Sequence, residues 1–500
     1  MSNKIPILKL IRRNLGISIL FVLSTAFFIY QNKINLSWDF ASYILNAKYL
    51  FYDGIYFEIY RSPIPVVLFG IFLLFGKLSS YLYIIFTSSL FLYSNISLAD
   101  AIFENPKLNK GLERRYLRFL FYFFSLSAFT LIFGLMLGTE LLSLAFFELF
   151  LAFLIRGRVS GHFLALAVLS RYNFLFFSFF LLFNKNYKKI LANIALFFAI
   201  LFPWLLFNYI KFGNWFASIV DSYAMNIFFR DYLIQPFNPL VILEVIGLYL
   251  PFLILGLIIS TIYFIKQKNK LSKSNRIILL FALTFILLIL EFERIPLKFE
   301  RYLFNLTLPV AFFSTLSMAF LINKFKKIKK LLVYTFVIVF IITTLTLANT
   351  LYQNKHHYDR IFAATEDIEK LDLKECRILS PHWVPLHYLT GNAYPLGGNL
   401  ISESVWRNEI VLIFKNYTTM DDSFTQEEIE TAPKLYETES YIFLAKENLT
   451  KHNCARTYVY DPLYTTEHCE IIASKFTKLK LENLALKFCK AINKKENFLN

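Results

Sequence analysis

The sequence predicts an α-helical polytopic membrane protein with a small C-terminal extracytoplasmic α/β domain. Of its 500 residues 57% are hydrophobic and only 17% are charged, whereas an ordinary soluble domain is roughly a quarter charged. Apolar runs long enough for membrane-spanning helices recur up to residue 354. The composition then changes, because residues 355–500 mix charged side chains with short strand-like runs.

About 11 apolar segments are candidates for membrane helices. Each is expected to be helical because lipid offers no partner to a bare backbone N–H or C=O. The run 162–183 contains Arg171, and we interpret it as two half-helices that meet at residues 170–172. The segments are 15–31, 63–76, 79–99, 117–137, 139–155, 162–183, 190–209, 240–265, 277–292, 302–322 and 331–351.

The basic residues predict an orientation in the cell membrane. For the count of basic residues, segment 63–99 is taken to cross the membrane once, and segment 162–183 is taken not to cross it. The loops on the side of the N-terminus then hold 24 Lys and Arg, and the opposite loops hold 8. Cytoplasmic loops carry such an excess, so the N-terminus is predicted to be cytoplasmic and the C-terminal domain extracytoplasmic. This distribution accounts for most of the net charge of +17, and it excludes a nucleic-acid partner.

We predict two domains, a transmembrane domain at 1–354 and a soluble one at 355–500. The second contains strand-like runs at 376–379 and 441–445 and helical patterns at 361–371 and 478–492. All four cysteines lie in it, and an outer location permits disulfides. We expect Cys454 to pair with Cys469; the alternative is four buried free thiols. No Cys-x-x-Cys occurs, so we expect no zinc site.

The first outer loop contains the main catalytic candidate, Asp39. Apolar residues recur at helical spacing over 40–50, and Ser37 can cap the start. We therefore expect an amphipathic helix in the membrane interface, with Asp39 in its first turn facing water. The alternative is that Asp39 only complements the helix dipole.

Other charged residues gather near the same membrane face. Arg61 precedes an apolar run, where it can bind a phosphate or act as a snorkelling anchor. Glu140 and Arg171 stand within apolar surroundings, and a charged cluster occupies 291–301. Ionisable residues at membrane depth indicate a functional site, although internal ion pairing is an alternative.

Five motifs occur in order across residues 39–309, and together they resemble the GT-C superfamily of polytopic glycosyltransferases. The resemblance is to the family 39 group of protein O-mannosyltransferases, lipid A aminoarabinose transferases and archaeal relatives. The resemblance does not extend to the C-terminal residues 355–500. The motifs are Asp39-Phe-Ala-Ser-Tyr43 running to Arg61-Ser-Pro63, Thr139-Glu140-Leu-Leu with Arg156-Gly157-Arg158, Leu164 to Ser170-Arg171-Tyr172, Pro203-Trp204 with Asn208-Tyr209, and Lys298-Phe-Glu300-Arg301-Tyr302.

The resemblance implies a GT-C type fold and an inverting transfer of a sugar from a polyprenyl or dolichyl phosphate to a protein, lipid or glycan. Mannose is the implied sugar, and an archaeal source is expected. Asp39 matches the general base of the family, which accepts the acceptor's proton. Arg61, Lys298, Arg301 and Arg171 are the implied phosphate-binding residues, because cations stabilise a leaving phosphate. Glu140 and Glu58 are secondary acidic candidates.

The chain departs from the family pattern at Phe40, because many relatives have a second acid there. Without an acidic pair we expect no cofactor and assign no metal ligand, although the sequence leaves a divalent metal open. A transporter or flippase of lipid-linked saccharides is the alternative function. A transporter usually has repeated halves, and we find no internal repeat.

Overall fold

The structure is a computed structural model of the chain. The predicted basic segment 1–14 lies outside the residues that it describes, and its placement stays a prediction. The described residues are 15–109, 111–184, 186–228, 235–266, 272–325, 329–396, 401–415, 426–462, 469–474, 476–477 and 480–492.

Seven helical runs in the described part of the chain are long and apolar enough to cross a membrane. They account for eight of the predicted apolar segments, because 63–76 and 79–99 belong to one run. These runs are Leu15–Ile34 (α2), Pro63–Phe103 (α4 Pro63–Phe72, η1 Leu73–Leu78 and α5 Ser79–Phe103), Tyr187–Phe212 (α11), Pro239–Lys266 (α13 Pro239–Ile246, η5 Gly247–Tyr249 and α14 Leu250–Lys266), Lys273–Arg294 (α15), Glu300–Lys324 (η6 Glu300–Leu306 and α16 Thr307–Lys324) and Leu331–Gln353 in α17 (Lys329–Gln353).

The other three predicted segments form shorter helices inside the bundle. The run 117–137 becomes α7 (Arg114–Ser125) and α8 (Ala128–Phe133), and 139–155 becomes α9 (Glu140–Ile155). The run 162–183 divides as predicted into α10 (Gly161–Ser170) and a 3₁₀ segment, η2 (Tyr172–Leu182). Arg171 separates them because its backbone is extended, with φ −162° and ψ 115°.

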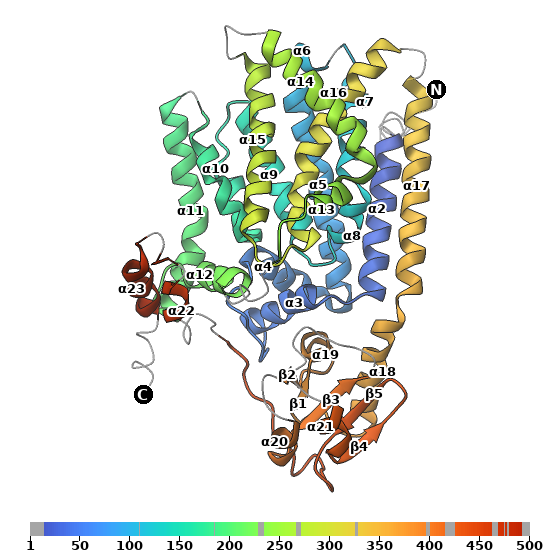
Figure 1. Ribbon diagram of the computed structural model, residues 1–500, viewed down its shortest axis with the longest axis vertical. Helices are drawn as coiled ribbons and strands as arrows, with labels where there is room; N and C mark the ends of the chain where they lie inside the picture. The colour runs from blue at the N-terminus through green and yellow to red at the C-terminus, as the bar shows by residue number, and fades with distance from the viewer. Residues whose placement is uncertain are drawn as a thin grey trace, which may run out of the picture.

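The bundle has two different ends, which we call the α3 end and the α6 end (Figure 1). Helix α3 (Trp38–Phe51) and the C-terminal sheet lie at the first, and α6 (Pro106–Asn109) lies at the second. A hydrogen bond from Asn105 to Ser274 and an ion pair between Arg156 and Glu104 join neighbouring loops at the α6 end. Described residues of three loops that we predicted to be cytoplasmic, 100–118, 156–161 and 266–276, therefore lie together at this end.

Close backbone contact holds the centre of the bundle together. Helices α5 and α9 pack along each other, and α14 packs on α16. A Cβ on Gly256 of α14 would lie 2.1 Å from the carbonyl oxygen of Phe313. Only glycine fits there, and small residues of this kind let membrane helices approach closely.

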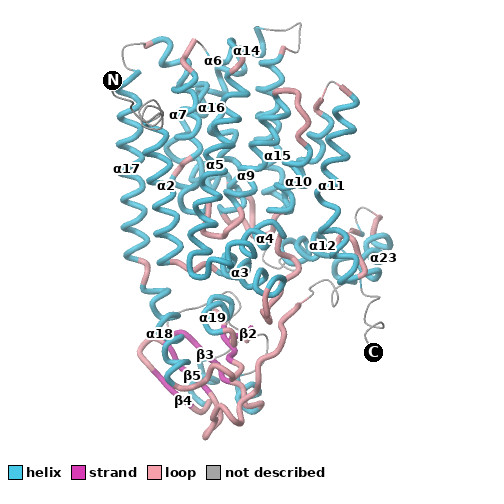
Figure 2. The backbone as a smooth tube through the Cα atoms, turned by 180° about the vertical axis from the view of Figure 1, so that it is seen from behind, coloured by secondary structure: helices cyan, strands magenta, loops and turns pink. Residues whose placement is uncertain are grey.

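A five-stranded sheet of order β2-β1-β3-β5-β4 forms the small C-terminal domain (Figure 2). Strand β1 pairs in parallel with β2 and β3, while β5 pairs antiparallel with β3 and β4. The elements are α18 His356–Lys370, β1 Ile378–Ser380, α19 Trp383–Thr390, β2 Ala393–Pro395, α20 Ile401–Trp406, β3 Ile410–Phe414, α21 Gln426–Thr431, β4 Lys434–Glu437 and β5 Tyr441–Leu444.

The predicted pairing of Cys454 with Cys469 is wrong. Cys454 is bonded to Cys376, which lies beside it where an isolated bridge joins residues 376 and 456. Cys469 is also disulfide-bonded, but it packs against Ala224 of the membrane domain, away from the sheet. Cys376 and Cys454 are 78 residues apart in the chain, and the fold brings them into contact.

The tail after residue 354 divides into two parts. Its first helix, α18, follows directly after α17, so the predicted domain boundary falls between these two helices. An arm at 455–462 then leads away from the sheet to α22 (Cys469–Ser474) and α23 (Glu482–Ile492). Figure 1 shows these last helices beside α12 (Ala217–Tyr223), where α22 contacts the π-helical turn η3 (Ala224–Phe228).

Candidate active site

Helix α3 positions Asp39 at the α3 end of the bundle. Ser37 caps the helix as predicted, because its Oγ accepts a hydrogen bond of 3.2 Å from the N–H of Phe40. Its placement in the membrane interface stays a prediction, but protein covers the side that we expected to face water. Residues 40–47 are all buried, because α4 packs against the helix from within the bundle and α19 from the sheet domain.

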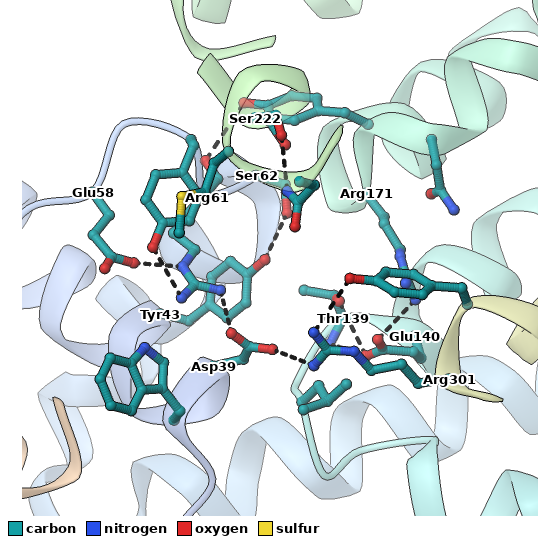
Figure 3. A pocket seen from close by; sticks show the side chains of 18 of the residues that line it. Asp39, Tyr43, Glu58, Arg61, Ser62, Thr139, Glu140, Arg171, Ser222 and Arg301 are labelled. Carbon is teal, nitrogen blue, oxygen red and sulfur yellow. Dashed lines mark hydrogen bonds and ion pairs between the residues drawn. The ribbon is translucent and has the colours of Figure 1, made fainter. Parts of the chain in front are cut away.

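Asp39 lies between two arginines (Figure 3). Its Oδ1 is 2.5 Å from Nη1 of Arg61, and its Oδ2 is 3.1 Å from Nη1 of Arg301. The contact with Arg301 joins residues 262 positions apart in the chain. The side chain of Asp39 is 22% exposed and faces the cavity between these two cations, and a helix-dipole role alone does not account for two ion pairs.

Arg61 is held in place by a second carboxylate, which is buried. The Nε of Arg61 donates to Oε2 of Glu58 at 2.6 Å, and the side chain of Glu58 is 1% exposed. Asn46 on α3 fixes the backbone of Glu58 with two hydrogen bonds, of 2.8 and 2.9 Å. The side chain of Arg61 is 11% exposed and lines a cavity, so it is not the snorkelling anchor that we considered.

The break between α10 and η2 contributes a third arginine. Arg171 Nη1 is 2.7 Å from Oε1 of Glu140, at the start of α9. The other oxygen of Glu140 accepts from the N–H and the hydroxyl of Thr139, at 3.3 and 3.1 Å. Ser62 donates to the carbonyl of Ser170 at 2.6 Å, which ties this break to the segment that carries Arg61.

The Pro-Trp motif on α11 supports the site from behind, a role that the sequence did not reveal. Trp204 and Asn208 lie one turn apart, and each donates to the hydroxyl of Ser218 at 2.8 Å. Trp204 also donates to the hydroxyl of Tyr172 at 2.8 Å. The motif therefore fixes α12 and the start of η2, which directly follows Arg171.

Lys298 is the one predicted phosphate-binding residue that the structure places elsewhere. Its Nζ donates to the carbonyl oxygens of Phe292 and Glu293. The last carbonyls of a helix have no partner within it, and a lysine can satisfy them. Lys298 thus caps the end of α15, and it is not among the described residues that line the cavity.

A single cavity of about 1280 Å³ encloses the three arginines and the three carboxylates. Glu291 and Arg294 at the end of α15 also line it. Sequence reasoning missed that Trp38 and residues of the C-terminal domain close its other side. Among the described residues, no three His, Cys, Asp or Glu side chains gather as a metal site would need.

The fold and site define a polytopic membrane protein with an arginine-lined cavity at one end of its bundle. The structure is similar to the crystal structure of ArnT from Cupriavidus metallidurans bound to undecaprenyl phosphate, with a TM-score of 0.54. The match covers 87% of this chain and 98% of ArnT at 10% identity. No family model and no curated protein matches the sequence. At this identity the likeness shows the fold alone, and the predicted GT-C fold class is confirmed.

Proposed function

We propose that the protein is an inverting membrane glycosyltransferase that uses a polyprenyl-phosphate-linked sugar. The observation that carries the proposal is Asp39 between Arg61 and Arg301 inside a cavity that also contains Arg171. In such a transfer, the carboxylate can accept the proton of the acceptor, and the arginines can bind the phosphate of the donor. The ArnT structure, bound to undecaprenyl phosphate, has the same fold, which supports this choice of donor.

The three arginines are suited to a phosphate. Arg presents a planar fork of donors that matches phosphate oxygens, and charge-assisted bonds of this kind are the strong ones. Each arginine here is paired with a carboxylate, so the cluster is close to neutral before substrate binds. A phosphate would compete with Asp39 for Arg61 and Arg301. Each arginine that turns to the phosphate leaves one carboxylate oxygen of Asp39 able to accept a proton.

The proposed reaction forms one bond and breaks one bond at the anomeric carbon. Asp39 accepts the proton of the acceptor hydroxyl, and the oxygen attacks from the face opposite the phosphate. The bond from the anomeric carbon to the phosphate oxygen breaks, and polyprenyl phosphate leaves. The arginines stabilise the charge that develops on it. By resemblance, dolichyl-phosphate mannose is the proposed donor, a protein, lipid or glycan is the acceptor, and the α3 end is extracytoplasmic.

The test is release of polyprenyl phosphate by purified protein that is given undecaprenyl-phosphate hexoses and a mixture of hydroxyl acceptors. We expect release by the natural chain and a loss of at least about 100-fold in Asp39→Asn, because a positioned general base contributes roughly 10²–10⁴-fold. Full activity in Asp39→Asn would exclude the general-base role. Movement of intact donor across vesicles without release would instead favour a flippase.

A further inference from the structure

The cavity has two walls of opposite character. Among the lining residues that the structure describes, every Asp, Glu, Lys or Arg comes from residues 36–302. The wall contributed by the C-terminal region contains aromatic residues, prolines, two aliphatic residues, a serine and a histidine. Its members are Tyr358, Ile361, Ser380, Pro381, His382, Trp383, Pro385, Pro395, Leu396, Tyr460 and Phe476.

The aromatic rings of this wall pack against the residue that precedes the catalytic candidate. Trp38 immediately precedes Asp39, and its ring packs edge-to-face on Trp383, with centroids 5.6 Å apart at 90°. The ring of Trp383 in turn packs against the ring of Tyr460, with centroids 4.6 Å apart. Trp383 is 6% exposed, whereas Trp38 is only partly buried. The result is a fixed aromatic surface that begins one residue from Asp39.

The size of the cavity leaves room for a second substrate. Pockets for drug-sized ligands measure about 300–1000 Å³, and this cavity measures about 1280 Å³. The arginine wall accounts for the phosphate of the proposed donor. The uncharged wall is therefore available to the acceptor.

We propose that Trp38 and the C-terminal wall form an acceptor subsite for an uncharged saccharide, so that the hydroxyl glycosylated is that of a sugar; this rests on the proposed function. A pyranose ring has an apolar C–H face that packs on a flat aromatic ring, and rim hydroxyls that suit neutral groups such as the hydroxyl of Tyr358, which is only partly buried. An anionic acceptor would need cations on this wall. A peptide would need backbone partners, and Pro381, Pro385 and Pro395 lack the N–H donor.

The experiment compares three tagged acceptors with undecaprenyl-phosphate hexoses as donors: 2-aminobenzamide-tagged mannobiose, tagged mannose 6-phosphate, and a tagged peptide rich in Ser and Thr. We expect transfer to mannobiose in preference to the other two. Trp38→Leu should raise the KM for mannobiose about tenfold with kcat within about threefold, because it keeps bulk but loses the aromatic face. Trp38→Phe should restore most of the affinity.

Trp406→Ala is the matched control, because Trp406 is 79% exposed on α20 and does not line the cavity. Its KM should stay within about twofold of the natural chain. Preferential transfer to the peptide or to the phosphosugar would overturn the saccharide subsite and leave the glycosyltransferase intact. A kcat loss in Trp38→Leu at unchanged KM would also overturn it. Absence of polyprenyl phosphate release with every acceptor would refute the proposed function itself.

Discussion

The two ends of the bundle both contain ion pairs, but only one builds a site with them. At the α6 end, Arg118 binds Asp100 in a bidentate pair at 2.7 and 2.8 Å, and its side chain is 31% exposed. At the α3 end, Arg61 is 11% exposed, and Asp39 is shared between two arginines around a cavity. Exposed pairs contribute little on their own. The site is therefore distinguished by ion pairs that are enclosed around a cavity and share a carboxylate. An ion pair alone does not distinguish it.

The comparison depends first on the two ends facing opposite compartments. Asp53 at the α3 end and Lys273 at the α6 end are both exposed, and Cys376, Cys454 and Cys469 are disulfide-bonded. In intact cells, an impermeant maleimide should label Asp53→Cys fully. It should label Lys273→Cys only after permeabilisation, because the loops rich in Lys and Arg stay cytoplasmic. Labelling of both from the same side would contradict the predicted orientation.

The next largest effect should separate an arginine of the cavity from one outside it. Arg301→Ala should lower kcat/KM for the donor up to about 100-fold, since it removes charge-assisted bonds to phosphate. Arg301→Lys should recover only part of this kcat/KM, because lysine keeps the positive charge but lacks the planar fork of N–H donors. Steady-state kinetics with varied donor measure both.

Arg118→Ala is the matched control at the α6 end. Its kcat/KM should stay within about threefold of the natural chain, because the pair with Asp100 lies outside the cavity. An equal loss in Arg118→Ala and Arg301→Ala would indicate a general effect on folding. The distinction between the two ends would then have no catalytic meaning.

The sequence predicted what local pattern determines. It predicted the apolar helices, the cap at Ser37 and the break at Arg171, because each depends on neighbours in the chain. It could not pair Asp39 with Arg301 or Cys376 with Cys454, because those contacts depend on how distant segments pack. Covering α3 with the sheet domain is likewise a tertiary event, and it buries a face that periodicity assigned to water.

Glu148 is a second case in which the sequence alone does not reveal the role of a residue. It lies two turns after Glu140 on α9 and is fully buried, where Ser94 and Asn95 on α5 donate to its Oε2 at 2.5 and 2.9 Å. Glu140 instead binds Arg171 at the cavity. Two glutamates on one helix therefore differ in role only because of what the neighbouring helices place beside them.

The smallest expected effect concerns acid sensitivity, which should be confined to the α3 end. Burial lowers the pKa of His387 on α19 to about 4, although its Nδ1–H donates to the carbonyl of Ala393 at 2.6 Å. An ordinary histidine has a pKa of about 6.5. The folded state thus disfavours the protonated ring, so stability is complete above about pH 6.5 and is lost as the pH falls toward 4.

At pH 5.5 this linkage corresponds to about 1.4 kcal/mol, or about tenfold in the open population of α19. Hydrogen exchange of α19 peptides, corrected for intrinsic rates, should show this loss of protection when the pH is lowered from 7.5 to 5.5. Peptides from the α6 end should keep their protection over the same range. His387→Asn keeps a donor for Ala393 but cannot gain the charge, so it should remove the difference. The same loss in His387→Asn would assign the effect to carboxylates instead. Because α19 supplies Trp383 to the cavity wall, acid should weaken the proposed acceptor subsite before it affects the arginines.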